Sequence, residues 1–256
     1  MKISIITVSY NAAATIRDTI ESVMAQDHPD VEYIIVDGGS KDGTMDIVRE
    51  YSDRMGKVVS ERDQGIYDAM NKGVAMATGD VVGILNSDDF YTDGKVLSDV
   101  ARLLESSGAT CLIGDLVIVH PEHPDRIQRY YSSEGFSLSW FEHGDMPPHP
   151  TFFVRRELYE RHGNFEKSYR ITADYDLMLR MMHLGKEPWV RLPRVMVTMR
   201  GGGNSNNGLR SKIRLNQEIM HSLHKHGLRS GAFRVYSKYF RKVFQLFRRP
   251  KPTSGN

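Results

Sequence analysis

The stretch from Val81 to Tyr91, VVGILNSDDFY, constrains the fold of this chain more than any other. It opens with an apolar run of the kind that forms a buried parallel strand. It then reaches two adjacent carboxylates, Asp88 and Asp89. Open α/β sheets bind ligands at the carboxyl ends of their strands, and hard divalent cations prefer oxygen ligands. The stretch therefore predicts a metal and nucleotide site, or else a simple turn, since Asn, Ser and Asp are turn formers.

Apolar strands alternate with amphipathic helices along the first hundred residues. Strands are expected where β-branched residues run together, and helices where apolar residues recur every three or four positions. The expected strands are 2–8, 31–36, 57–61 and 81–86, and the expected helices are 16–24, 45–51 and 66–77. This alternation predicts an α/β fold with a parallel, doubly wound sheet. Asn11 is expected to cap the first helix.

Three loops should meet at the carboxyl edge of this sheet: Ser9–Asn11, Asp37–Ser40 and Asn86–Asp89. The two glycines of the second loop would let its backbone approach a ligand closely. Asp37 is a good acceptor for a donor group of a base or ribose. No G-x-G-x-x-G follows the first strand and no G-x-x-x-x-G-K-[ST] occurs, which argues against a dinucleotide or P-loop site.

Charge is distributed unevenly along the 256 residues, although the net charge is only +2. Residues 206–256 hold 12 of the 34 Lys and Arg residues but one of the 32 acids, Glu218. This basic segment is expected to meet an anionic surface. The single cysteine, Cys111, excludes an internal disulfide and is expected in the core. The sequence shows neither a signal peptide nor an apolar run of the roughly 20 residues that span a bilayer.

Histidines and a second carboxylate centre mark the later part of the chain. His120 and His123 have the spacing of metal ligands, with solvated loop histidines as the alternative. Tyr169–Arg180 predicts a helix whose first turn carries Asp174. That acid is either a functional carboxylate or simply favourable at a helix start.

Three segments in order resemble the family 2 glycosyltransferases, which have the GT-A fold: SIITVSYNAAATIRDTIESV, IIVDGGSKDGT and ATGDVVGILNSDD. The segments DQGIYDAMNKG, HPTFFVRREL and YRITADYDLMLR are similar to the branch that builds bacterial capsules, exopolysaccharides and glycolipids. The resemblance implies a GT-A domain at 1–205, with a nucleotide-sugar-binding half at 1–100 and an acceptor and catalytic half at 101–205. A basic helical extension, 206–256, would follow.

The resemblance implies roles for individual residues. Asn86-Ser87-Asp88 falls on the family's D-x-D triplet, so Asp88 would bind Mn²⁺ or Mg²⁺ at the donor diphosphate, with Asp89 as a direct ligand or a supporting residue. Asn86 departs from the Asp of many members, which would weaken metal binding. The implied donor nucleotide site consists of Thr7, Ser9, Tyr10, Asn11, Asp37, Gly38, Ser40, Asn86 and Ser87.

The family's catalytic base corresponds to Asp174, in an Ala-Asp pair. His149 corresponds to a histidine beside the acceptor or the diphosphate, and Asp176 would support the site. Arg200–Asn207 is expected to form a lid over the donor. The remaining acceptor, diphosphate or lid positions are Asp68, Arg200, Gly202 and Asn204.

Two helices are expected in the basic tail, at 213–226 and 232–249. The histidines of the first, His221, His224 and His226, should be solvated. The second has an aromatic stripe opposite a basic face, which predicts an interfacial helix on an anionic membrane. Packing on the body and nucleic-acid binding are the alternatives, and no nucleic acid is expected.

Together these features predict an inverting, non-processive, metal-dependent glycosyltransferase of bacterial surface polysaccharide or glycolipid synthesis. It would carry sugar from a nucleotide-sugar to a saccharide acceptor, lipid-linked, at the inner face of the cytoplasmic membrane, as a cytoplasmic, peripherally bound protein. The alternatives are a catalytically weak GT-A domain that acts as a membrane-docked binding module, and a nucleotidyltransferase.

Overall fold

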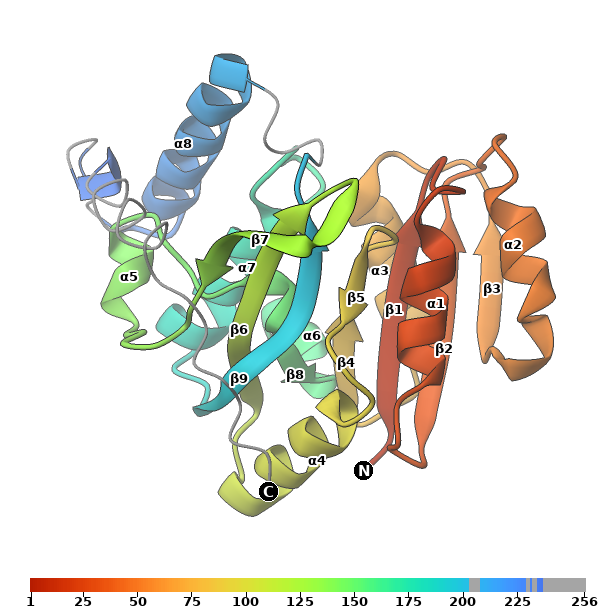
Figure 1. Ribbon diagram of the computed structural model, residues 1–256. Coiled ribbons are helices and arrows are strands. Elements are labelled where there is room, and N and C mark those ends of the chain that lie inside the picture. Colours follow the sequence, from red (N-terminus) through yellow and green to blue (C-terminus); the bar gives the residue numbers. More distant parts are fainter. Residues whose placement is uncertain (203–207, 229–230, 232–233, 237–256) are drawn as a thin grey trace.

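The computed structural model describes residues 1–202, 208–228, 231 and 234–236. Its elements follow one another as an alternating α/β chain that ends in a long helix (Figure 1). In chain order they are β1 (Ile3–Ser9), α1 (Ile16–Met24), β2 (Val31–Asp37), α2 (Thr44–Glu50), η1 (Ser52–Arg54), β3 (Lys57–Ser60), α3 (Ile66–Met76), β4 (Val81–Ile84), β5 (Asp89–Tyr91), α4 (Val96–Ser107), β6 (Cys111–His120), β7 (His123–Tyr131), α5 (Ser139–Glu142), η2 (His149–Thr151), β8 (Phe153–Arg155), α6 (Glu157–His162), α7 (Ala173–Met178), η3 (Leu179–Leu184), β9 (Trp189–Arg200) and α8 (Gly208–Lys225).

The described residues form one sheet of nine strands in the order β3-β2-β1-β4-β8-β6-β9-β5, with β7 paired to β6. Strands β3, β2, β1 and β4 are parallel, as the sequence predicts for an α/β fold. Beyond β4, where the sequence analysis predicts no strand direction, β8 runs antiparallel to both β4 and β6. The sheet is mixed and continues without interruption across residue 100.

The two faces of the sheet carry separate cores. Successive side chains of a strand point to opposite faces, so Ile3 and Ile5 pack with α1, α2 and α4. Ile6 and Val8 pack with α3, α7 and α8 on the other face. At Gly73 of α3, an added Cβ would lie 2.4 Å from Cγ2 of Ile6, so the helix can approach the sheet only without a side chain there.

Several local predictions differ from the structure. Asn11 does not cap the first helix; it has a left-handed φ of 49°, and α1 begins after Thr15. Its side-chain oxygen instead accepts the N–H of Lys41, 3.0 Å away. The strands β5 and β7 are absent from the prediction. β5 has only three residues, and β7 is polar with no buried residue. Cys111 is buried, as expected.

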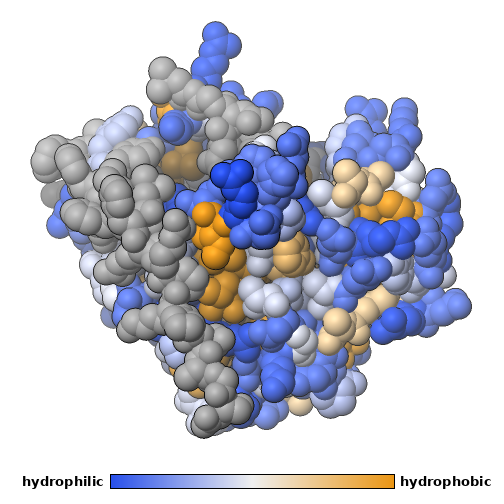
Figure 2. Space-filling view, in the orientation of Figure 1, coloured by the Kyte–Doolittle hydropathy of each residue, from blue (hydrophilic) through white to orange (hydrophobic). Residues whose placement is uncertain are grey.

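The surface in Figure 2 is mostly hydrophilic, with small hydrophobic areas. Among the described residues, no helix is both long and apolar enough to cross a membrane. The described part of 206–256 is packed on the body: Ile219 and Leu223 of α8 are buried in the core beneath α3 and α7.

One buried carboxylate ties the parallel strands together at the edge opposite the predicted site. Glu32 of β2 accepts hydrogen bonds from Ser4 Oγ at 2.6 Å and from the Thr78 N–H and hydroxyl at 2.7 and 2.8 Å. Lys2 and Lys57 each lie 3.7 Å from it. Burial opposes its charge, but the hydrogen bonds outweigh burial and lower the pKa of Glu32 to about 2.

We expect Glu32→Gln to lower the free energy of unfolding at pH 7 by about 1–3 kcal/mol, since a buried carboxylate loses its donors. Because the pKa of folded Glu32 is lower than the ordinary Glu pKa of about 4.3, this contribution is complete above that pH and disappears as the pH falls toward 2. Urea unfolding of wild type and Glu32→Gln should therefore show a gap between their free energies of unfolding that becomes smaller as the pH falls. Glu50→Gln, at the exposed pair with Arg17, is the control and should change little. A gap that is constant with pH would contradict this role.

Candidate active site

The three predicted loops do converge at one edge of the sheet. β1 is parallel to β2 with Ser9 opposite Asp37, and β1 is parallel to β4. Immediately beyond β4, the N–H of Leu85 donates to the carbonyl of Ile6. The strand ends are therefore level, because parallel neighbours in this register finish at the same edge.

Asp37 is fully buried and already saturated with hydrogen bonds. Its Oδ1 accepts the hydroxyls of Ser9 and Ser40, and its Oδ2 accepts the N–H groups of Gly39 and Ser40 and the hydroxyl of Ser60. Burial raises the pKa of Asp37, but these donors outweigh burial and lower it. The carboxylate thus fixes the second loop, and it has no lone pair left for a base or ribose.

The other predicted nucleotide residues divide into buried and accessible ones. Thr7 is fully buried and shares a hydrogen bond of 3.1 Å with Tyr33. Ser9 and Ser40 are engaged with Asp37, and Ser40 also accepts the N–H of Asn11. Tyr10 is 67% exposed at the same edge, so its ring is accessible to a ligand.

Asp63 is a site residue that the sequence reasoning did not select. A Cβ on Gly38 would lie 2.5 Å from Asp63 Oδ2 and 3.3 Å from Cδ2 of Tyr10, so these three residues are neighbours. Asp63 Oδ1 accepts the N–H of Gly65. Oδ2 has no hydrogen-bond partner in the described part of the chain. The signal was present in the sequence, since Asp63 opens the segment DQGIYDAMNKG.

The carboxylates of the D-x-D-like triplet differ in burial. Asp89 is fully buried, whereas Asn86, Ser87 and Asp88 are partly exposed in the turn before β5. Burial raises the pKa of Asp88, and nearby Arg200 and His149 partly oppose this. Burial and the charge of Asp88 raise the pKa of Asp89 well above its usual value.

Three buried oxygens beside Asp88 make no hydrogen bond of normal geometry within the described residues: Asn86 Oδ1 and both carboxylate oxygens of Asp89. The Arg200 N–H and the Asn86 side chain lower the pKa of Asp89 but do not offset burial and the charge of Asp88. Buried polar atoms are rarely left without partners. An all-oxygen set of this kind suits Mg²⁺ or Mn²⁺.

Arg200 holds this turn in place. It ends β9, and its guanidinium donates to the carbonyl of Asp88 at 3.0 Å and pairs with Asp18 of α1. The guanidinium also lies 4.9 Å from the ring centre of Phe90. With an exposed fraction of 8%, Arg200 is a buried anchor of the turn that contains Asp88 and not part of an exposed loop. Gly202 is exposed beyond it with φ 97°, whereas Asn204 and the rest of 203–207 lie outside the described residues.

His149 reaches the same edge through chain reversal. Because β8 is antiparallel to β4, the residues before β8 lie where β4 ends. His149 Nδ1 is 3.1 Å from Asp174 Oδ2, and His149 is near enough to Asp88 to lower its pKa. The structure therefore brings together Asp88, His149 and Asp174, which are widely separated in sequence.

Asp174 is the second residue of α7, and 14% of its side chain is exposed. Burial raises its pKa, while His149 and the N–H of Tyr175 oppose the rise. Burial therefore outweighs the helix start, and a carboxylate with a raised pKa is a stronger base. Asp176, two residues on, is 1% exposed and bonded to Arg180, so it supports the fold.

The predicted solvation of the tail histidines is wrong for His226. Its Nε2 is 3.0 Å from Asp176 Oδ1, and Ser222 Oγ donates to the same oxygen at 2.7 Å. His221 stacks edge-on against Tyr169, with ring centres 5.9 Å apart.

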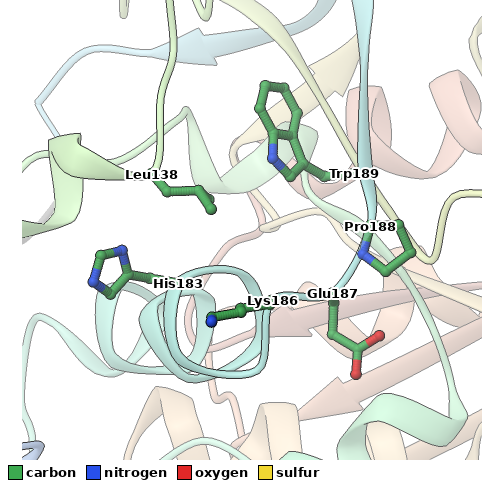
Figure 3. Close-up of a pocket in the computed structure, with 6 residues that line it drawn as sticks. All are labelled: Leu138, His183, Lys186, Glu187, Pro188 and Trp189. Carbon is green, nitrogen blue, oxygen red and sulfur yellow. The ribbon is translucent and has the colours of Figure 1, made fainter.

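The structure has two hollows outside the group formed by Asp88, His149 and Asp174. A cavity of about 450 Å³ lies between the start of α3 and residues 167–170, and Tyr67, Asp68 and Arg170 line it. Asp68 is held there by Lys167 at 3.1 Å. The larger hollow, about 570 Å³, is surrounded by Leu138, His183, Lys186, Glu187, Pro188 and Trp189 (Figure 3). Trp189 begins β9 and Arg200 ends it, so this larger hollow lies far from Asp88.

The model of the family described as glycosyl transferase family 2 matches residues 4–163 of this sequence. The chain belongs to glycosyl transferase family 2. Its relatives include a PGL/p-HBAD biosynthesis glycosyltransferase of Mycobacterium bovis, 32% identical over 181 residues that cover 69% of this chain and 68% of the relative. An uncharacterized glycosyltransferase of Nostoc sp. is 31% identical, over 73% of this chain and 61% of its own. This enzyme family excludes the nucleotidyltransferase alternative.

Solved structures of other glycosyltransferases share the fold. S. aureus TarS residues 1–349, in complex with UDP-GlcNAc, has a TM-score of 0.69 at 18% identity, over 95% of this chain and 73% of its own. The chain spans 44% of a longer TarS structure. The mannosyltransferase PcManGT of Pyrobaculum calidifontis, in complex with GDP-Man and Mn²⁺, has a TM-score of 0.66 at 19% identity, over 93% and 69% of the two chains. The family 2 glycosyltransferase therefore has the GT-A fold, as predicted.

The different surroundings of Asp37 and Asp63 predict different mutant behaviour. We expect Asp37→Asn to lower the free energy of unfolding by at least about 2 kcal/mol, because an amide cannot accept all five donors. Asp63→Asn should leave the unfolding temperature within error but weaken nucleotide binding, since Oδ2 is free to accept an N–H of a base. Thermal unfolding, and calorimetric titration with UDP and with GDP in the presence of Mn²⁺, measure both effects. Equal nucleotide binding by wild type and Asp63→Asn would reject the role of Asp63.

Proposed function

We propose that this family 2 glycosyltransferase transfers a sugar from a nucleotide-sugar to a saccharide acceptor, with inversion and one sugar at a time. The observation that carries the proposal is the row Asp88, His149 and Asp174 at the carboxyl edge of the sheet. Asp88, at one end of this row, suits a diphosphate with its cation. Asp174, at the other end, suits a general base. Nucleotide-sugars in the similar TarS and PcManGT complexes support the donor class.

Asp88 and Asp89 would hold Mn²⁺ or Mg²⁺ at the donor diphosphate. Within the described residues, no three His, Cys, Asp or Glu side chains are grouped to hold a cation by themselves. The remaining ligands would therefore come from the diphosphate and water. When bound, the ion neutralises charge on the departing diphosphate.

The residues of the chain account for the remaining steps. Asp174 Oδ2 accepts the proton of the acceptor hydroxyl as that oxygen bonds to the anomeric carbon, and the bond from this carbon to the diphosphate breaks. His149 orients the Asp174 carboxylate and lies between it and Asp88. Attack from the side opposite the leaving group inverts the anomeric centre. We place the acceptor in the 450 Å³ cavity that Asp68 lines.

A catalytically weak binding module is the second candidate, because Asn86 removes one charge from the triplet. A thermal-shift screen of nucleotide-sugars with and without Mn²⁺, followed by measurement of nucleoside diphosphate release, separates the two. A true donor raises the unfolding temperature by mass action. An enzyme also releases the diphosphate, whereas a binding module does not.

We expect Asp88→Asn to abolish transfer and the Mn²⁺-dependent part of the thermal shift, because the amide cannot replace a charged ligand. The fold should be retained, since Asp88 is partly exposed in a turn. Product formation and circular dichroism measure the two results. Transfer at the wild-type rate would show that the metal assignment is wrong.

We expect Asp174→Asn to keep donor and metal binding while turnover falls on the order of 10²–10⁴-fold, as for loss of a general base. Because the pKa of Asp174 is raised, wild-type turnover should fall with acid at a pH above that of an ordinary Asp. Turnover at saturating acceptor gives the comparison. Unchanged turnover excludes Asp174 as the base, and loss of folding would assign it to the helix start.

A lipid-linked acceptor would require attachment to a membrane, and the basic tail could supply it. Of residues 232–249 the structure describes 234–236, where Arg234 pairs with Glu142 at 3.2 Å and Val235 is buried. The remainder of the aromatic and basic stripe lies outside the described residues. Each basic residue near an anionic surface contributes about 1 kcal/mol.

We expect a chain ending at Gly227 to remain folded and bind nucleotide but to lose sedimentation with anionic vesicles. Its activity on a lipid-linked acceptor should fall more than its activity on a short acceptor without lipid. Neutral vesicles are the control, and added salt should weaken binding of the full chain. Equal sedimentation by both chains would reject the membrane role.

A further inference from the structure

Helix α8 contacts the active site through a polar stripe. Glu218 and Ser222 of α8 and His226, the residue just after its end, recur every fourth residue, and the His226 N–H still donates to the Ser222 carbonyl, so the three lie along one face. All three side chains are bonded to the segment around Asp174. The sequence assigned this helix to a basic extension outside the catalytic domain.

Glu218 holds the backbone immediately before α7. It accepts the N–H groups of Arg170, Ile171 and Thr172 at 3.1, 3.0 and 3.2 Å, and the Thr172 hydroxyl at 3.2 Å. Charged acceptors give the stronger hydrogen bonds. Thr172 itself provides no side-chain cap for α7. A carboxylate from another helix therefore binds the N–H groups of the three residues that precede α7, of which Thr172 is the N-cap.

The second contact lies just after Asp174. Asp176 accepts Ser222 Oγ at 2.7 Å, lies 3.0 Å from His226 Nε2, and accepts Arg180 Nε at 2.8 Å. Asp176 and Ser222 are buried. Asp174 is thus flanked on both sides, two residues away, by backbone or side chains that α8 fixes.

We propose that α8 is a positioning element of the active site and that Glu218 sets the orientation of Asp174 toward His149. Packing alone does not require this acid, because Ile219 and Leu223 already bury the apolar face of α8. It is the one acid among residues 206–256, and it faces the segment that carries the base. The proposal rests on the proposed role of Asp174, whose His149 contact of 3.1 Å is the geometry that Glu218 protects.

Glu218→Ala and Glu218→Gln in the full chain test this inference, with Glu166→Gln as the matched control. Glu166 also links the body to α8, through Lys225 at 3.0 Å, but at a half-exposed pair away from residues 170–172. Hydrogen exchange of peptides covering 169–176 measures directly whether the N–H groups of residues 170–172 remain bonded to Glu218. Calorimetric titration with UDP and Mn²⁺ reports the donor site. Turnover uses the nucleotide-sugar that the thermal-shift screen identifies.

In Glu218→Ala we expect amide exchange at 170–172 to accelerate roughly tenfold or more, because three N–H groups lose a charged acceptor. Turnover should fall on the order of 10²-fold, as for a displaced catalytic group, while the affinity for UDP with Mn²⁺ stays within twofold. Glu218→Gln keeps one acceptor oxygen and should be intermediate. Glu166→Gln should match wild type in all three measurements.

Unchanged exchange at 170–172, or faster exchange with wild-type turnover, would overturn the inference. Should Glu218→Ala not fold, Glu218→Gln gives the same decision. Asp174→Asn separates the two proposals. If Asp174→Asn is inactive and the Glu218 variants behave as wild type, the positioning role alone fails. If Asp174→Asn is fully active, the proposed base itself fails.

Discussion

The antiparallel pairing of β8 with β4 is the constraint on which the active site depends. A strand parallel to β4 would begin at the far edge, and the residues before it would lie away from Asp88. Because β8 runs in the opposite direction, it starts at the edge where Asp88 and Asp89 follow β4. His149, which precedes β8, therefore lies at that edge. β6 and β9 then extend the sheet so that Arg200 finishes against the turn that contains Asp88. Two changes of strand direction, from β4 to β8 and from β8 to β6, thus join the parallel strands β1 to β4 to β6 and β9.

Carboxylates of the same chemical type serve different purposes here because their neighbours differ. Asp37 is surrounded by N–H and hydroxyl donors, so it stays ionised and holds a loop. Asp89 is buried beside another carboxylate with few donors, so its charge is unfavourable and its pKa is raised. Asp174 is buried beside a histidine and its pKa is raised by burial, which suits the proton transfer that we propose for it. The distribution of donors, and not the residue type, separates these roles.

Residue patterns were sufficient where one local property decided the outcome. The parallel strands β1 to β4, the edge at which their loops meet and the start of α7 near Asp174 all followed from apolar periodicity and short motifs. Residue patterns were insufficient where the partner of a side chain comes from a segment that is distant in sequence. The pattern predicts that Asn11 caps a helix, but its side-chain oxygen accepts the Lys41 N–H instead. The pattern also predicts that Asp37 is free to accept a donor from a ligand, but five donors of the protein already bind it. The same applies to His226, which is held by Asp176 across fifty residues.

The sequence by itself determined that this chain is an α/β protein of a glycosyltransferase type with acids at the carboxyl edge of its sheet. Strand composition, helix periodicity and ordered motifs are properties of contiguous residues, and they survive without knowledge of the packing. Only the tertiary structure decided which acids remain available, that Asp63 lies beside Gly38, and that Glu218 of the C-terminal helix α8 binds the backbone just before Asp174. Hydrogen-bond saturation and burial depend on which segments meet in space, and a linear pattern does not specify those partners.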